Sequence, residues 1–193
     1  MHGNKILLAA VLIALGVSSQ AHAVVTSCTA GNPISTGVPE STPTSAFTDN
    51  LDGTVTHNLT GLIWKHCSEG QAWDGVTCNG TAATFRWGAA LIQSKNANFA
   101  GHTDWRLPNH KELMSIVEYC GYIPAINTVE FPGTPASSFW SGSAYTAYAW
   151  YVDFSDGATN INANVYSFYA RLVRGGRRID SFDAQVVFAN GFQ

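Results

Sequence analysis

The chain has 193 residues, of which 46% are hydrophobic, 12% are aromatic and only 12% are charged. Thirteen Asp and Glu residues outnumber ten Lys and Arg residues, which gives a formal net charge of −3 at pH 7. This acidic balance excludes the basic surface that nucleic-acid binding requires, and the length fits one domain of ordinary size with a full hydrophobic core.

The N-terminus predicts a secretory signal peptide over residues 1–23. Lys5 precedes an apolar run from Ile6 to Val17, and the triplet Ala21–Ala23 supplies an A-x-A cleavage site. The apolar run is too short to span a bilayer, which takes about 20 residues. We therefore expect an extracellular, periplasmic or cell-surface protein with no membrane span after cleavage. Loss of Lys5 leaves the mature chain with a formal charge of −4.

Four cysteines lie in the exported part, at Cys28, Cys67, Cys78 and Cys120. In an oxidising compartment they predict two disulfides, for which three pairings exist. We favour Cys67–Cys78, because this pair brackets a short loop that contains glycines, and this choice leaves Cys28–Cys120. A metal site that combines His66 with Cys67 and Cys78 lacks paired C-x-x-C spacing. We therefore expect no metal and no cofactor.

The first half of the mature chain begins with residues 24–46, which are rich in Pro, Ser, Thr and Gly and predict an irregular N-terminal arm. Residues 47–64 hold short runs of β-forming residues around Asp52-Gly53 and residues 58–61. They predict a β-hairpin that ends in a buried strand at Leu62–Trp64.

Two helices are predicted in the middle of the chain. The first runs from Phe85 to about Ala97, because Trp87, Ala90, Leu91 and Ser94 fall at helical spacing. The second runs from Lys111 to Cys120 and begins with Asn109 as the N-cap and Glu112 as its reciprocal partner. Its apolar face consists of Leu113, Ile116, Val117 and Cys120.

The remainder predicts four strands: Phe139–Ser143, Ala149–Phe154, Thr159–Tyr166 and Tyr169–Arg174, with a turn at Asp156-Gly157. Helices in the middle with antiparallel strands around them predict an α+β domain. Residues 177–193 form a C-terminal extension, for which one more strand and a sorting tail both remain open.

Five ordered motifs carry a resemblance to a known family: Asp52–Val55 with Thr60–Trp64, Gly101–Asn109 with Glu112-Leu113, Phe139–Ser141, Ala149–Phe154 and Arg171–Arg174. Together they resemble the Lcl C-terminal domain family, which is named after the C-terminal domain of the Legionella collagen-like adhesin. The resemblance covers residues 47–176.

The resemblance implies a C-type-lectin-like fold, and it implies an adhesin domain that binds sulfated glycosaminoglycans and assembles as a homotrimer. The R-L-P turn and the closing Arg-Leu-Val also resemble the formylglycine-generating branch of that superfamily, which depends on a reactive cysteine pair. This chain departs from the adhesin pattern, because it is acidic and has no collagen-like G-X-Y stalk. It also lacks the E-P-N, Q-P-D and W-N-D tripeptides of calcium-dependent lectins.

Two sets of residues are candidates for a ligand surface. The first is a basic patch of Arg171, Arg174, Arg177 and Arg178, which suits an anionic ligand. The alternative for its first two members is one arginine packed inside and one in solvent. The second set combines the alternating Asn160, Asn162 and Asn164 with Trp150 and Tyr166, because amides and aromatic rings suit a saccharide. The alternative for the amides is a solvated strand face.

The tripeptide Asp104-Trp105-Arg106 has a structural interpretation, in which ion pairing and Trp burial lock the turn that opens the second helix. No catalytic residue is assigned, because the H-E-x-x-H and G-x-S-x-G patterns are missing. We therefore expect a non-enzymatic lectin-like adhesion module whose partner is a glycan or another surface polymer. One alternative is a structural subunit of a surface filament or complex, in which the exposed aromatics of residues 145–151 form the assembly face. The other is an oxidase of the formylglycine-generating type.

Overall fold

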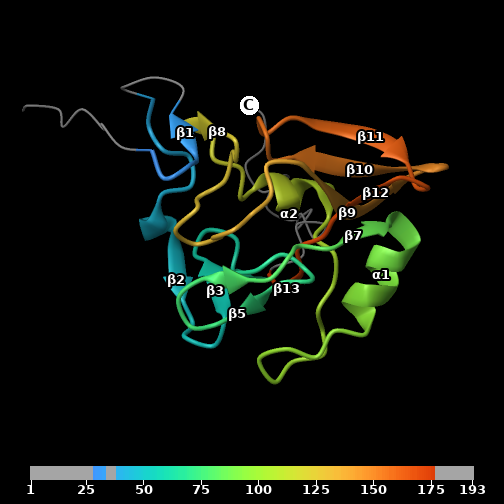
Figure 1. The fold of residues 1–193 in the computed structure, drawn as a ribbon, viewed down its shortest axis with the longest axis horizontal. Coiled ribbons are helices and arrows are strands. Elements are labelled where there is room, and N and C mark those ends of the chain that lie inside the picture. Colours follow the sequence, from blue (N-terminus) through green and yellow to red (C-terminus); the bar gives the residue numbers. More distant parts are fainter. Residues whose placement is uncertain (1–27, 34–37, 177–193) are drawn as a thin grey trace, which may run out of the picture.

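The computed structural model describes residues 28–33 and 38–176. The expected signal peptide, the C-terminal extension, Arg177 and Arg178 lie outside the described residues. The described chain has the expected α+β class, with two helices, mostly antiparallel sheets and two disulfides (Figure 1). Within this part of the chain, no helix is long and apolar enough to cross a membrane.

The larger sheet has five strands in the order β11-β10-β9-β12-β7. Its members are β7 (Thr84–Arg86), β9 (Ser138–Tyr145), β10 (Tyr148–Asp153), β11 (Thr159–Ala163) and β12 (Ser167–Tyr169). Neighbours pair antiparallel except β12 and β9, which are parallel. Helix α1 (Trp87–Lys95) follows β7 directly, so it lies at the sheet edge opposite β11 (Figure 1).

The smaller sheet has four strands in the order β13-β4-β3-β2. Its members are β2 (Phe47–Asp49), β3 (Thr54–His57), β4 (Leu62–Lys65) and β13 (Val173–Gly175). A turn at Asp52-Gly53 joins β2 to β3, and residues 58–61 join β3 to β4, so the predicted hairpin is confirmed as part of a three-stranded meander. Gly53 has φ 87°, and a side chain there would also collide with Phe99.

Short elements complete the described fold. They are two ribbons, β1 (Asn32–Pro33) with β8 (Gly121–Tyr122) and β5 (Ala72–Trp73) with β6 (Cys78–Asn79), and a 3₁₀ turn at Thr44–Ala46 before β2. The 3₁₀ turn interrupts the arm that was expected to be irregular.

Hydrophobic clusters cover both faces of the larger sheet. Phe139 and Trp140 are neighbours on β9, so their side chains point to opposite faces. Phe139 belongs to the cluster that contains Leu113 of helix α2 (His110–Met114), and Trp140 belongs to the cluster that contains Ala90 of α1. Each helix therefore buries its apolar side against a different face of this sheet.

Helix α2 is shorter than the sequence indicated. The predicted capping box is present, because Asn109 Oδ1 accepts from the N–H of Glu112 while the Glu112 carboxylate accepts from the N–H of Asn109. The helix ends at Met114 rather than at Cys120. Beyond it, Val117 forms a β-bridge with Ile126, a tertiary contact that helical periodicity does not reveal.

The predicted strand Tyr169–Arg174 is wrong as a single element. Strand β12 ends at Tyr169 in the larger sheet, and β13 begins at Val173 in the smaller sheet. The three residues between them, 170–172, are completely buried where the chain passes from one sheet to the other. Strand β11 is also shorter than predicted, because it ends at Ala163.

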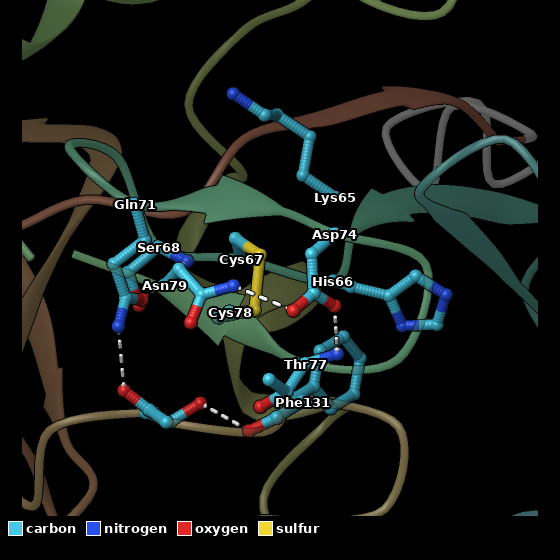
Figure 2. The surroundings of a disulfide bond; sticks show 12 residues. Lys65, His66, Cys67, Ser68, Gln71, Asp74, Thr77, Cys78, Asn79 and Phe131 are labelled. Carbon is cyan, nitrogen blue, oxygen red and sulfur yellow. Dashed lines mark hydrogen bonds between the residues drawn. A yellow bond between two sulfur atoms is a disulfide. The ribbon is translucent and has the colours of Figure 1, made fainter.

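Both disulfides have the pairing favoured from the sequence, Cys28–Cys120 and Cys67–Cys78. The first attaches the N-terminal arm next to β8. The second closes the ribbon β5–β6, where the side-chain amide of Asn79 donates to the carboxylate of Asp74 at 2.6 Å (Figure 2). The two bridges therefore fix segments that contribute little to either hydrophobic cluster.

Candidate functional site

Arg171 is completely buried, which contradicts its predicted place on a ligand surface. Its guanidinium donates to four oxygen atoms, the backbone carbonyls of Lys65 and His66 and the hydroxyls of Ser68 and Thr134. Burial lowers the pKa of Arg171 to about 9, which still leaves the guanidinium charged at neutral pH. Arg171 therefore joins the end of β4 to the loop that contains Thr134, from inside the protein.

The tripeptide Asp104-Trp105-Arg106 stabilises the entry to α2, as interpreted from the sequence. Arg106 forms a bidentate pair with Glu112, with N–O distances of 2.6 and 2.9 Å. Trp105 is only 3% exposed. Asp104 accepts a 2.8 Å hydrogen bond from Arg174 Nε, which lowers the pKa of the Asp104 carboxyl. The motif therefore connects α2 to β13.

The predicted basic patch is not assembled in the described part of the chain. Arg171 is inside the protein, and Arg174 is paired with Asp104 while its guanidinium lies 6.0 Å from the ring centre of Trp105. Arg177 and Arg178 fall outside the described residues. The alternative of one packed arginine and one nearer to solvent is the arrangement found for Arg171 and Arg174.

The prediction of one surface that combines the asparagine amides with aromatic rings is also wrong. Across β10 and β11, Asn162 lies opposite Ala149 and Asn160 lies opposite Tyr151. Trp150 lies instead opposite Ile161. Because residues directly opposite each other in a ladder share a face, the two amides and Trp150 point to different faces of the sheet. Asn164 lies beyond the end of β11.

Aromatic side chains gather at one end of the larger sheet, and we call this group the aromatic tip: Tyr145, Tyr148, Trp150 and Tyr166. Tyr145 and Tyr148 lie directly opposite each other where a two-residue turn joins β9 to β10. The N–H of Asn164 donates to the carbonyl of Ala147, which brings the turn that carries Tyr166 next to this hairpin. The three tyrosines are 53%, 44% and 56% exposed in chain order.

His110 supports the one tryptophan of the aromatic tip. Its ring stacks on Trp150 with centroids 4.4 Å apart. The hydroxyl of Thr159 donates to the carbonyl of Tyr151, so it accepts from His110 Nε2, 2.6 Å away. This contact fixes the proton of the neutral ring on Nε2, and burial lowers the pKa of His110. The first residue of α2 therefore holds the Trp150 ring in place.

The turn within the aromatic tip is strained. Thr146 has φ 52°, in the left-handed region that β-branched residues rarely adopt. Strain of this kind collects at functional sites, where the surrounding structure holds the residue in place. The hairpin that presents Tyr145 and Tyr148 therefore has a feature typical of binding sites.

A second group of titratable residues lies beside the Cys67–Cys78 bridge. His66 Nδ1 donates to the carbonyl of Glu130 at 2.6 Å, while Nε2 lies 3.4 Å from Asp49 Oδ1. Trp73 stacks on the imidazole at 4.4 Å, and burial raises the pKa of the Glu130 carboxyl. Among residues 28–33 and 38–176, no three His, Cys, Asp or Glu side chains form a group that could hold a metal ion.

The model of the Lcl C-terminal domain matches residues 53–174, which is more than half of the chain. The chain belongs to the Lcl C-terminal domain family. This match includes both helices, strands β3 to β12 and the whole aromatic tip. No curated protein matches the chain.

The motifs that identify the Lcl C-terminal domain describe its interior more than its surface. Trp64, Trp105, Trp140 and Arg171 are all buried motif residues. Trp150 is the motif residue that reaches the aromatic tip. The sequence therefore indicated the family through its packing, whereas Thr146 and His110 were not recognised as parts of a site.

Nothing in the sequence around His110 indicates that its ring packs against the aromatic tip. Its stacking partner Trp150 and its hydrogen-bond partner Thr159 belong to strands β10 and β11, far along the chain. For Tyr145 and Tyr148 a signal exists, because two tyrosines flank a two-residue turn and cross-strand partners there share one face.

Proposed function

We propose that this Lcl C-terminal domain is a secreted, non-enzymatic adhesion module that binds a glycan or another surface polymer through the aromatic tip. The observation that carries the proposal is the pair of exposed tyrosines, Tyr145 and Tyr148, that lie opposite each other at the end of the sheet, where the Tyr145 ring packs edge-on against Trp150. Tyr and Trp rings offer a flat apolar face to the C–H groups of a sugar and keep a polar atom for its hydroxyls. The relationship to C-type lectins remains part of the proposal.

The ligand that we propose is uncharged, in contrast to the sulfated glycosaminoglycans implied by the sequence resemblance. A sulfated chain needs clustered cations, and Arg171 and Arg174 are engaged with protein groups. The aromatic tip contains no Lys, Arg, Asp or Glu, and the supporting ring of His110 has a pKa lowered by burial. Stacking on these rings therefore favours neutral saccharides.

A glycan array tests this proposal with the mature chain, residues 24–193, at low and physiological salt. We expect binding to neutral polysaccharides that salt does not weaken and that the Tyr145→Ala/Tyr148→Ala variant loses. Tyr119→Ala/Tyr122→Ala is the matched control, because these two tyrosines are similarly exposed but lie around β8. Binding to sulfated chains alone, or no binding at all, contradicts the proposal.

A second candidate function is a structural subunit of a surface filament or complex, in which the aromatic tip contacts another subunit. The same exposed rings favour it, because neighbouring exposed apolar groups often mark protein interfaces. Light scattering at micromolar concentration separates the candidates: an assembly that dissociates in the Tyr145→Ala/Tyr148→Ala variant favours the subunit, including a homotrimer. An oxidase receives less support, because all four cysteines are joined in bridges.

A further inference from the structure

The outer edge of β11 is a place where strand pairing stops. In the described part of the chain, β11 pairs only with β10. An exposed edge presents unpaired N–H and C=O groups, and it is a template for a strand from another molecule. The sequence of β11, Thr-Asn-Ile-Asn-Ala, contains neither the lysines nor the prolines with which edges are commonly protected.

The ladder shows which backbone groups point outward. The N–H of Asp153 donates to the carbonyl of Ala158, and the N–H of Asn164 donates to the carbonyl of Ala147. Ala158 and Asn164 therefore turn their backbone groups toward β10. Because backbone direction alternates along a strand, Thr159, Ile161 and Ala163 turn their N–H groups toward the free edge.

Two of these three N–H groups, those of Ile161 and Ala163, are engaged by asparagine side chains. Asn160 Oδ1 accepts from the N–H of Ile161 at 2.8 Å, and Asn162 Oδ1 accepts from the N–H of Ala163 at 2.8 Å. Only the oxygen of an amide accepts a hydrogen bond, so these contacts fix how both side chains are turned. A docking strand has to displace the two amides before it can use these N–H groups.

We propose that Asn160 and Asn162 close the edge of β11 against strand addition, which keeps the larger sheet from pairing with the sheet of a second copy of this chain. This inference goes beyond the proposed function, because it concerns self-association rather than ligand binding. It also gives the alternating asparagines a role that neither a saccharide surface nor a solvated strand face provides. Assembly of the protein, where it occurs, then uses another surface.

The Asn160→Val/Asn162→Val variant tests the proposal. Valine favours a strand, but its side chain has no oxygen, so the N–H groups of Ile161 and Ala163 become free. We expect dimers and larger species by light scattering, with increased thioflavin T binding, at concentrations where the unaltered chain shows neither. Asn164→Val is the matched control, because it changes the same residue type just beyond β11, where the side chain engages no backbone N–H of the described residues.

A third variant separates strand pairing from added hydrophobicity. Ala163→Pro on the double-valine background removes one outward N–H that the ladder with β10 does not use, and we expect it to reduce the self-association. Equal self-association of the Asn164→Val control overturns the proposal, and so does a folded double-valine variant that behaves like the unaltered chain.

Hydrogen exchange of the unaltered chain gives an independent readout if the double-valine variant fails to fold. We expect the amides of Ile161 and Ala163 to exchange more slowly than the amide of exposed Val165. Equally fast exchange at all three positions overturns the proposed caps.

Discussion

Arg171 shows how a single buried cation organises several segments. Its guanidinium supplies charge-assisted hydrogen bonds to the carbonyls of Lys65 and His66. We expect Arg171→Met to lower the free energy of unfolding by about 3–5 kcal/mol, because the carbonyls and hydroxyls lose their donors. Urea denaturation measures this loss.

Arg174→Met is the control for this measurement. Arg174 has a more exposed partner in Asp104, and pairs near the surface contribute about 1 kcal/mol or less. Similar losses in the two variants would contradict the role that we assign to Arg171.

Glu130 gives a prediction about pH. Burial raises the pKa of its carboxyl above the ordinary value of 4.5, so the folded chain keeps this proton at pH values where the unfolded chain has lost it. The contribution of Glu130 to stability therefore falls as the pH rises through this window. We expect Glu130→Gln to become more stable relative to the unaltered chain between about pH 4 and about pH 7. Thermal unfolding at both pH values checks this, and a constant difference in melting temperature contradicts it.

Local elements were predictable where local chemistry sets them. The helix α1, the Asn109–Glu112 capping box and the turn at Asp52-Gly53 all follow from residues close together in the sequence. The end of α2 was not predictable, because it depends on the bridge between Val117 and Ile126. A hydrophobic pattern shows which residues are buried, but it does not show which sheet receives them.

The hairpin of the aromatic tip carries a prediction about strain. Asparagine tolerates the left-handed conformation better than threonine, because its side chain is not branched at Cβ. We expect Thr146→Asn to raise the free energy of unfolding by about 0.5–1 kcal/mol, as measured by urea denaturation. The neighbouring Ala147→Asn is the control, since φ at Ala147 is not positive. Destabilisation by Thr146→Asn would mean that the turn is not strained.

At the scale of the whole molecule, the two disulfides differ in the length of chain that they close. Cys28–Cys120 spans a sequence separation of 92, whereas Cys67–Cys78 spans 11. Loop entropy predicts a loss of about 5 kcal/mol for Cys28→Ser/Cys120→Ser and about 3 kcal/mol for Cys67→Ser/Cys78→Ser. Denaturant unfolding of both variants checks the order, and a larger loss for the short loop contradicts this explanation.

The family, the α+β class and the disulfide pairing could be predicted from the sequence, whereas the candidate site could be predicted only in part. Trp150 and Tyr166 were expected in it, and both belong to the aromatic tip. The predicted position of the asparagine side chains was wrong, because the register of β11 against β10 decides which face of the sheet they occupy. Arg171 was misplaced because a buried cation and an exposed one look the same in a sequence.

The affinity of the mature chain for a neutral oligosaccharide, measured by calorimetry at two salt concentrations, tests the proposed binding surface most directly. We predict the same affinity at both salt concentrations, a loss of at least about tenfold in Tyr145→Ala/Tyr148→Ala, corresponding to about 1.4 kcal/mol, and no change in Tyr119→Ala/Tyr122→Ala. An unchanged affinity in the Tyr145→Ala/Tyr148→Ala variant would contradict the aromatic tip as the ligand surface.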